Sequence, residues 1–576
     1  MIVPSIRKFR RRGQTSSVAL LLAVTLTACA GQPPARQAAG AGPEGTPLAP
    51  KTMTIAVMGE PPGFISELYQ GASVGAGAPT ATNLAHNGLV YTNDQDSRVA
   101  QLAAQVISVE AGTWRLSADG TMETTWRLRP NVKWQDGTPF TADDLLFAFT
   151  VFKDPEIPNT VGQPLRLMQS AIAPDPLTIV VRWASPYVNA DQAPGLVPMP
   201  RHLLEPVYRE SKANFASSPL LSAGWVGLGP YRLTHWEPGV QLEFIRFDDY
   251  FMGRAKFDTV VMRFFSDPNA MVANILAGSV DVILPLAVDI PQALAVQRLW
   301  EGTGNQVMFP PRGSLRHLEI QHRPDFEEPK NTSRNRVVRQ ALYHAIDLQT
   351  LVDVVTEGIS PIADSWIPPA HELRPVVKMP QFPYDLTRSQ QLLATTGWSR
   401  GPDGILANQA GERFEILLYG SNVGSTEAEV NTIAAGWRAV GVQPKFYVIP
   451  SALSSDREHR AKLPGMGLNG IGFDAFTSNR LHSRDIPSDA TRWNGNNRGG
   501  YENPRVDAIL DKLVVTIDPK DRVALHQQLA DEQMGDVALM PLYWNADPVL
   551  ALKGVTGLPK TEGKGATRTI FDWDKQ

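Results

Sequence analysis

The chain has 576 residues, of which 43% are hydrophobic, and its formal net charge at pH 7 is −4. A single hydrophobic core rarely grows beyond about 250–300 residues, so a chain of this length is expected to fold into more than one lobe. The acidic balance argues against nucleic-acid or anionic-lipid binding as the main function, because both require a basic surface.

The N-terminus has the order of parts that is typical of an export signal. Five basic residues lie between Arg7 and Arg12, an apolar run covers residues 18–24, and the small residues Thr27 and Ala28 precede Cys29. This run is shorter than the roughly 20 apolar residues of a membrane-spanning helix, and the order indicates a secretory signal peptide. Leu-Thr-Ala-Cys also resembles the lipobox of bacterial lipoproteins. We therefore expect residues 1–28 to be removed, Cys29 to carry lipid, and the protein to be exported and anchored to a membrane, facing the periplasm or the cell exterior.

Removal of residues 1–28 and lipidation of Cys29 would have two consequences for the mature chain. Removal of residues 1–28 leaves 49 Lys and Arg against 58 Asp and Glu, a net charge of −9. Cys29 is the only cysteine, so its lipidation leaves none for a disulfide. Residues 29–50 are rich in Gly, Pro, Ala and Gln and predict a flexible tether.

Folded sequence begins with a short strand pattern at residues 53–57. Thr141 predicts the start of a helix, and apolar spacing predicts one continuous helix over 336–356 that ends before Gly358. Asn503-Pro504 and Asp518-Pro519 predict two further helix starts. The remaining strands are expected at 177–183, 241–247, 259–264 and 414–419.

One unit indicates the fold class. Strand 413–419, helix 427–440 and strand 444–449 form a predicted βαβ crossover, which requires a parallel pair with its helix packed on the sheet. The class is therefore α/β, in more than one lobe.

Ordered sequence blocks extend over nearly the whole mature chain. They resemble family 5 of the extracellular solute-binding proteins, the dipeptide, oligopeptide and nickel receptors of ABC importers. The blocks that carry the resemblance are 127–144 (RLRPNVKWQDGTPFTADD), 229–232 (GPYR), 277–281 (AGSVD), 339–342 (RQAL), 501–507 (YENPRVD) and 540–543 (MPLY). A further block is 345–347 (AID). We expect Arg339 and Asp347 to serve the scaffold rather than the ligand.

The resemblance implies a two-lobed fold of the periplasmic-binding-protein type II class, with an extra domain inserted in the first lobe. Lobe I is expected to comprise 51–92, 210–310 and 541–576, the inserted domain 93–209, and lobe II 311–540. Two crossing segments would join the lobes, which would close over a ligand by a hinge motion.

The resemblance also points to ligand-binding residues. Peptide-binding members pair an aspartate with the peptide ammonium, and Asp474, after Phe473 in loop 470–479, lies at the matching position. This loop continues with Thr477-Ser-Asn where peptide binders have an Asp-Pro pair. Further candidates are Trp493, Asn494, Trp366 and Tyr69, each of which could alternatively serve packing or loop structure.

The sequence gives little support to a metal site, a nucleotide-binding site or a hydrolytic site. His317 and His322 are expected on one strand, where their spacing would direct them to opposite faces and prevent a shared metal. A phosphate-binding Gly-x-x-x-x-Gly-Lys-Ser/Thr motif and a Gly-x-Ser-x-Gly nucleophile elbow are both absent. We expect a monomer that is not an enzyme and holds no cofactor or metal.

The leading hypothesis is a receptor that binds a solute, with a short peptide first in order, and delivers it to the permease and ATPase subunits of an ABC importer. The alternatives are a ligand-sensing receptor for signalling and a receptor for an oligosaccharide, opine or metal chelate. An exported hydrolase is a third possibility that has only the expected cleft in its favour.

Overall fold

The computed structural model describes residues 50–69, 77–93, 97–330, 332–369, 371–421, 425–450, 453, 456–472, 480–558 and 567–576. Cys29, Phe473 and Asp474, and with them the expected signal peptide and most of the tether, lie outside these residues. Among the described residues, the chain from Pro50 to Gln576 belongs to one compact unit.

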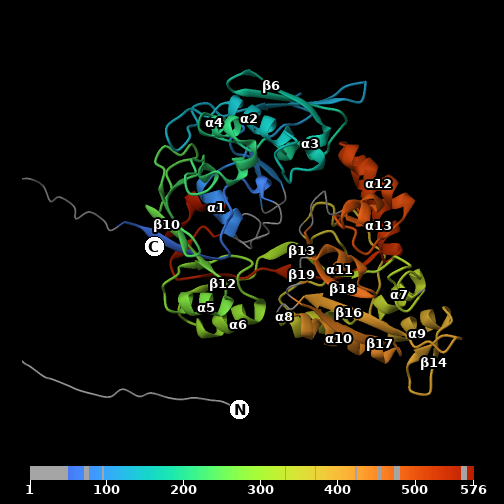
Figure 1. The fold of residues 1–576 in the computed structure, drawn as a ribbon. Helices are drawn as coiled ribbons and strands as arrows, with labels where there is room; N and C mark the ends of the chain where they lie inside the picture. The colour runs from blue at the N-terminus through green and yellow to red at the C-terminus, as the bar shows by residue number, and fades with distance from the viewer. Residues whose placement is uncertain are drawn as a thin grey trace, which may run out of the picture. The chain divides into compact units, whose positions relative to one another are not determined.

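Lobe I contains a mixed sheet of seven strands, drawn with its helices in Figure 1. Strand β1 (Thr52–Met58) lies inside this sheet and pairs in parallel with both β10 (Thr259–Phe265) and β11 (Val282–Ile283), so this strand has a hydrogen-bonded neighbour along each edge. The strand order is β12 (Gln306–Met308), β20 (Val549–Ala551), β11 (Val282–Ile283), β1 (Thr52–Met58), β10 (Thr259–Phe265), β9 (Gln241–Arg246) and β8 (Tyr231–Glu237). Its helices are α1 (Gly77–Ala85), α5 (Pro268–Leu276) and α6 (Ile290–Leu299).

A second, four-stranded antiparallel sheet lies within the expected insertion. Its order is β4 (Trp114–Leu116), β5 (Met122–Arg127), β7 (Thr178–Trp183) and β6 (Met168–Asp175), with helices α2 (Ala142–Lys153), α3 (Gln163–Leu167) and α4 (Arg201–Glu210). Thr141 caps α2 through a capping box with Asp144, which confirms the predicted helix start. Buried residues of this sheet, such as Trp126, belong to the same hydrophobic cluster as Met53 of β1, so the two sheets share a core.

Lobe II contains a five-stranded sheet of order β17 (Gln443–Ile449), β16 (Glu415–Ser421), β18 (Met466–Gly472), β13 (Pro311–Ile320) and β19 (Leu539–Ala546). Strands β16 and β17 are parallel and α10 (Thr426–Ala439) connects them, which confirms the predicted βαβ unit. Further helices are α9 (Leu386–Ala394), α11 (Arg457–Lys462), α12 (Pro504–Val515) and α13 (Pro519–Gly535). Asn503 and Asp518 cap α12 and α13, as predicted.

The prediction of one helix over 336–356 was wrong. The structure has two helices, α7 (Arg336–His344) and α8 (Leu348–Thr356), and the side chain of Asp347 caps the second by accepting the Thr350 N–H at 3.0 Å. At the break, α10 packs so closely that a Cβ on Gly436 would lie 1.8 Å from the Ala345 carbonyl oxygen. The apolar spacing continues through the break because both helices contribute to one core.

Two segments connect the sheets of the two lobes. The chain leaves lobe I at β12 and enters lobe II at β13, and it returns from β19 to β20. Strands β13 and β19 pair antiparallel, and Figure 1 shows them side by side. At the return, the Asp547 N–H donates to the Pro310 carbonyl at 3.2 Å, so the two crossings are in contact.

Three two-stranded antiparallel sheets are also present among the described residues. They are β2 (Val90–Thr92) with β3 (Arg98–Ala100), β14 (Ser399–Arg400) with β15 (Leu406–Ala407), and β21 (Val555–Thr556) with β22 (Asp574–Lys575).

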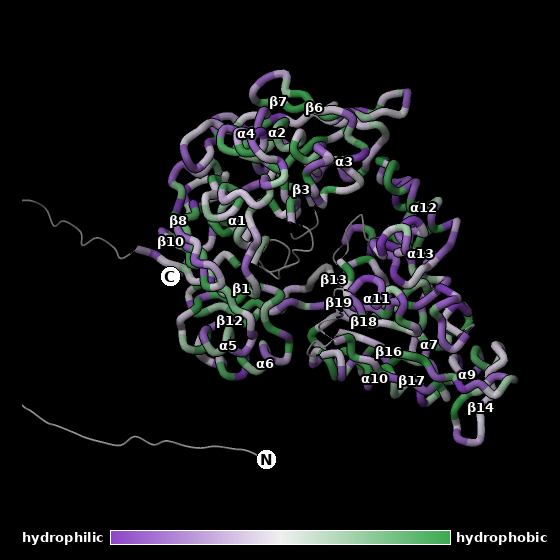
Figure 2. The backbone as a smooth tube through the Cα atoms, in the orientation of Figure 1, coloured by the Kyte–Doolittle hydropathy of each residue, from purple (hydrophilic) through white to green (hydrophobic). Residues whose placement is uncertain are grey.

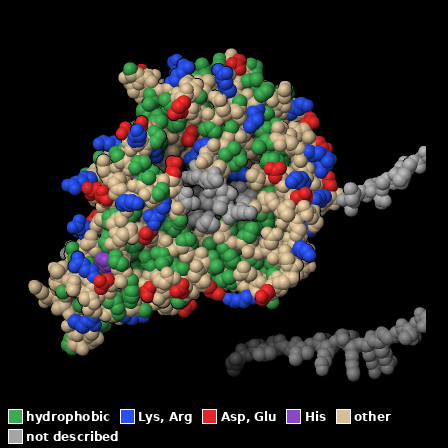
Figure 3. All heavy atoms as spheres, turned by 180° about the vertical axis from the view of Figure 1, so that it is seen from behind, with side chains coloured by type: hydrophobic (Ala, Val, Ile, Leu, Met, Phe, Trp, Pro, Cys, Tyr) green, Lys and Arg blue, Asp and Glu red, His purple; other side chains and the backbone are tan. Residues whose placement is uncertain are grey.

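The hydropathy of the described residues and the charges on their surface agree with the composition, which is 43% hydrophobic with a net charge of −4. None of their helices combines the length and apolar character needed to cross a membrane, and polar and apolar stretches alternate along the chain in Figure 2. On the face drawn in Figure 3, basic and acidic side chains are interspersed. This distribution differs from the continuous basic surface that nucleic-acid binding requires.

Candidate ligand-binding site

A small cavity of about 40 Å³ is lined in part by the neighbouring strands β18, β13 and β19 of the lobe II sheet. Strand β13 contributes Leu315 and Glu319, which lie four residues apart and therefore point to the same face. The lining consists of Leu315, Glu319, Trp366, Ile471, Gly472, Arg480, Leu481, Asn496, Gln533 and Leu539. Apolar walls thus surround a few polar groups, which is the composition of a small-molecule site.

Glu319 supplies the negative charge of the cavity. Its Oε2 accepts a hydrogen bond from Asn469 Nδ2 at 2.7 Å. Burial raises the pKa of this carboxyl, but the guanidinium groups of Arg480 and Arg498, with His317 and the Asn469 amide, outweigh burial and hold the pKa below its ordinary value. Glu319 is therefore ionised at neutral pH.

Arginine side chains gather around this carboxylate. Burial lowers the pKa of Arg480, and so does the nearby charge of Arg498, while Glu319 opposes both effects. Arg460 responds in the same way to burial and to Arg498. The groups remain cationic because an arginine pKa lies far above neutrality.

His317 lies next to Glu319 on the strand but is 2% exposed. Burial, followed by the charge of Arg480, lowers its pKa to about 4. The imidazole is therefore neutral at physiological pH and adds no charge to the site. His322 follows the end of β13, so the expectation that both histidines share one strand was wrong.

Of the predicted site residues, Trp366 lines the cavity, and Phe473 and Asp474 lie outside the described residues. Trp493 packs beneath Lys462, whose Nζ lies 4.7 Å from the ring centroid, and Asn494 is exposed. Neither lines this cavity. Tyr69 belongs to lobe I, where it packs against the core beside Gly63. Trp493, Asn494 and Tyr69 therefore stay predictions.

The sequence reasoning missed Glu319, Arg480, Asn496 and Gln533. Glu319 carried no distinctive signal either, because a charged residue between Leu318 and Ile320 is the ordinary alternation of a strand with one polar face. Gln533 lies on α13, far along the chain, and nothing in its local pattern distinguishes it from other helical polar residues.

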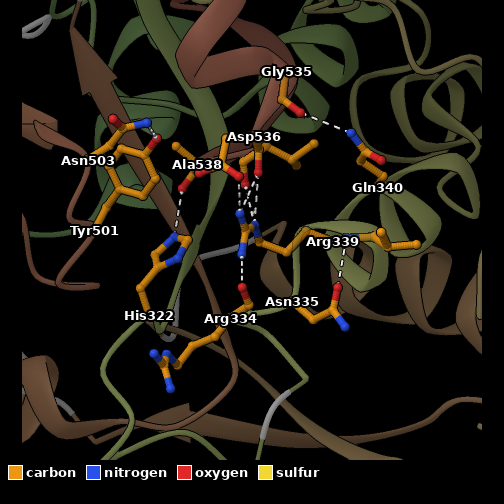
Figure 4. Close-up of polar contacts among 12 residues, drawn as sticks. His322, Arg334, Asn335, Arg339, Gln340, Tyr501, Asn503, Gly535, Asp536 and Ala538 are labelled. Atoms are coloured by element: carbon orange, nitrogen blue, oxygen red, sulfur yellow. Dashed lines mark hydrogen bonds and ion pairs between the residues drawn. The ribbon is translucent and has the colours of Figure 1, made fainter. Parts of the chain in front are cut away.

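Arg339 has a scaffold role, as expected. It is 2% exposed, and its guanidinium donates to the carbonyls of Ser333, Arg334, Asp536 and Val537 and to the Asp536 carboxylate. Figure 4 shows the side chain reaching across to the end of α13, near the bond from Gln340 to Gly535. These contacts occupy the guanidinium with the protein's own carbonyl and carboxylate groups.

Groups of three or more His, Cys, Asp or Glu side chains that could hold a metal ion are not found within the described ranges.

The comparisons of this chain with known proteins agree with one another. Residues 105–491 match the model for bacterial extracellular solute-binding proteins, family 5 Middle. The oligopeptide-binding protein AppA of Bacillus subtilis is 23% identical over 538 residues, covering 90% of this chain and 91% of AppA.

Two solved structures share the fold. NikZ from Campylobacter jejuni in complex with Ni(L-His) superposes with a TM-score of 0.73 at 21% identity, over 91% of this chain and 99% of NikZ. The oligopeptide-binding protein from Thermus thermophilus complexed with a pentapeptide gives a TM-score of 0.69 at 22% identity, over 91% of this chain and 96% of that protein. The two-lobed α/β architecture predicted from the sequence is confirmed. The chain belongs to family 5 of the bacterial extracellular solute-binding proteins.

Proposed function

We propose that this protein is an extracytoplasmic receptor that binds a short peptide between its two lobes and delivers it to the permease of an ABC importer, whose ATPase supplies the energy. The observation that carries the proposal is the family match across 105–491, which includes most of both lobes. A ligand that makes contacts available only in the closed form would shift the population toward closure. The peptide class is supported by the oligopeptide-binding relative.

The same proposal includes the anchor and the domain boundaries. Cys29 carries the lipid, residues 29–50 form the tether, and the protein faces the periplasm or the cell exterior as a monomer. Lobe I comprises 51–92, 210–310 and 541–576, the inserted domain 93–209 and lobe II 311–540. The proposed ligand contacts are Asp474, Phe473, Trp493, Asn494, Trp366 and Tyr69.

A receptor for a metal chelate is the second candidate. It is favoured by the similarity to NikZ, which was solved with Ni(L-His). Thr477-Ser-Asn stands after Asp474 where peptide binders have an Asp-Pro pair, which argues against a peptide.

Native mass spectrometry of residues 30–576, purified without denaturant from cells grown in rich medium, tests the ligand class. We expect a mixture of adducts that fragment as short peptides, because main-chain recognition gives broad selectivity. A single non-peptide mass would contradict the peptide assignment and favour the chelate.

Asp474→Asn tests the proposed ammonium contact. We expect calorimetry to show that the substitution weakens a free-amine tripeptide by about 2 kcal/mol or more, the cost of losing a buried charge pair. Asp489→Asn, an exposed aspartate of the same lobe, is the matched control. Unchanged affinity in Asp474→Asn would remove this residue from the site.

A further inference from the structure

The C-terminal end of α12 contacts two hydrophobic cores. Leu513 is buried in the cluster of lobe II. Val514, the next residue of α12, and Ile517, in the turn that follows, pack instead against the cluster that lobe I shares with the four-stranded sheet. These two residues of lobe II therefore bury apolar surface against the other lobe, which stabilises contact between the lobes.

The opposing surface is the segment of residues 187–191, which follows strand β7 of the four-stranded sheet. Tyr187 fixes the start of this segment, because its ring is buried and stacks on Trp183 with the ring centroids 5.4 Å apart. A short 3-10 helix (Ala190–Gln192) continues the segment, and Ala190 is also buried. Tyr187 and Ala190 belong to the core shared with lobe I, so the segment is expected to move with that lobe.

A backbone hydrogen bond joins the two surfaces. The Val188 N–H donates to the Val514 carbonyl at 3.0 Å. This carbonyl is one of the last four of α12, for which an α-helix supplies no internal donor. Arg522 of α13 donates to two other carbonyls of the same helix end, those of Leu513 and Thr516, at 2.8 and 3.1 Å. The end of α12 is therefore completed partly by lobe II and partly by the segment 187–191.

Opposite charges lie on the two sides of this contact. Burial lowers the pKa of Arg522, and the negative charges of Asp191 and Glu372 oppose this effect. Asp191 also forms an ion pair of 3.7 Å with Arg98 of its own lobe. The Asp191 carboxylate therefore attracts the guanidinium of Arg522, whereas a carboxylate added at the end of α12 would meet Asp191 with like charge.

This contact is separate from the two segments that cross between the lobes. The crossings meet where the Asp547 N–H donates to the Pro310 carbonyl. A hinge motion rotates one packed core against the other about such crossings, so contacts elsewhere between the two cores must form or break. Opening would therefore return Val514 and Ile517 to water and break the hydrogen bond from Val188.

We propose that residues 187–191 and 514–517 form a latch that holds the two lobes in the closed form. The latch consists of protein groups alone, and none of its residues is a proposed ligand contact, so its contribution to closure is the same for every ligand. This inference rests on the hinge closure of the proposed function and adds the residues that set the balance between the open and closed forms.

Small-angle X-ray scattering of residues 30–576 without added ligand tests the latch. Val514→Asp removes an apolar contact and places a carboxylate near Asp191. We expect its radius of gyration to rise by about 1 Å or more above wild type, for which a compact chain of this size predicts roughly 24 Å. Val515→Asp is the matched control, because it adds the same charge at the same helix end on a side chain that is 40% exposed, and it should keep the wild-type radius. An unchanged radius in Val514→Asp, or an equal rise in Val515→Asp, overturns the proposal.

Ile517→Ser guards against a folding defect in the charged variant. It shortens the second apolar contact without adding charge, so the radius of gyration should again rise. The far-ultraviolet circular dichroism spectrum should stay equal to that of wild type. If both variants expand only together with a loss of this signal, the radius reports unfolding and the proposal fails.

Calorimetry with Ala-Ala-Ala connects the latch to the proposed function. The apparent Kd of a ligand increases when the closed form that binds it is less populated. Val514→Asp should therefore weaken the tripeptide at least about 3-fold, and Val515→Asp should bind it as wild type does. Equal affinity in Val514→Asp and wild type overturns the proposal. If the tripeptide binds none of these proteins while the radius still responds to Val514→Asp, the peptide assignment fails and the latch stands.

Discussion

Acidification from pH 7 to pH 5 is expected to lower the free energy of unfolding by about 6 kcal/mol through three buried histidines that contribute about 2 kcal/mol each, and His322, whose pKa burial lowers to about 3, should add a similar amount. His86, His317 and His526 are 3%, 2% and 5% exposed. Burial lowers the pKa of His86 to about 3, and the nearby Pro198 carbonyl opposes this only in part. Burial, with smaller contributions from neighbouring cations, lowers the pKa of His317 to about 4 and that of His526 to about 3.

The direction follows from where each state binds protons. In the unfolded chain a histidine titrates near pH 6.5, whereas these three in the folded protein stay neutral until about pH 4 or below. Between these values the unfolded state binds more protons, so protonation favours unfolding. The stabilisation is complete above about pH 6.5 and decreases as the pH falls toward the folded-state pKa values.

Urea unfolding at pH 7, 6 and 5 measures this effect. His86 stacks on Trp134 with ring centroids 6.1 Å apart and meets Trp225 edge-on at 5.0 Å, so His86→Phe preserves an aromatic ring in the same place. This variant should lose about 2 kcal/mol less than wild type on acidification. His235→Phe changes an exposed histidine and should keep the full pH dependence. The same loss in His86→Phe as in wild type would show that His86 titrates normally in the fold.

Removal of the buried Glu429 carboxylate should lower the free energy of unfolding by an amount similar to that expected for acidification. Arg316 Nε and Nη2 both lie 2.6 Å from the Glu429 carboxylate, which also accepts the Tyr543 hydroxyl at 2.6 Å. Glu429 is fully buried on α10, and its partners come from β13 and β19. Glu429→Ala leaves the Arg316 charge in the interior without this partner, for which the expected cost is about 3–5 kcal/mol.

Two other variants separate this ion pair from a general effect on the helix. Glu427→Ala, at an exposed position near the start of α10, should cost less than about 0.5 kcal/mol. Tyr543→Phe removes one hydrogen bond to a charged acceptor and should cost about 1.5–3 kcal/mol. All three can be compared by urea unfolding at pH 7. A loss below about 1 kcal/mol in Glu429→Ala would mean that Arg316 finds another partner or reaches water.

The triad of Arg316, Glu429 and Tyr543 also concerns the connection between the lobes. Strands β13 and β19 continue into the two crossing segments, and Glu429 connects both strands to α10. The lobe II ends of the crossings are thereby held in a fixed position. We therefore expect hinge motion to occur outside the triad, toward the contact between Asp547 and Pro310.

The sequence by itself determined the fold class, the family and most individual elements. Alternating apolar residues specified β1, β9 and β10, and caps such as Thr141 and Asn503 specified where helices begin, because both signals depend on neighbours within a few residues. Scaffold roles were also expected for Arg339 and Asp347. In the structure Arg339 donates hydrogen bonds to Asp536 at the end of α13, and Asp347 caps α8.

Only the tertiary structure decided how distant segments meet. Residues 336–356 form two helices instead of the predicted one, with the break at Ala345, where Gly436 of α10 packs closely. The apolar spacing continues through the break without interruption. The tertiary structure also placed Glu319, Trp366, Arg480 and Gln533 around one cavity. These residues come from a strand, two loops or turns and a helix that lie far apart in the sequence, so no local pattern relates them. Their common environment arises from sheet pairing and helix packing, and that environment sets the charge of the site.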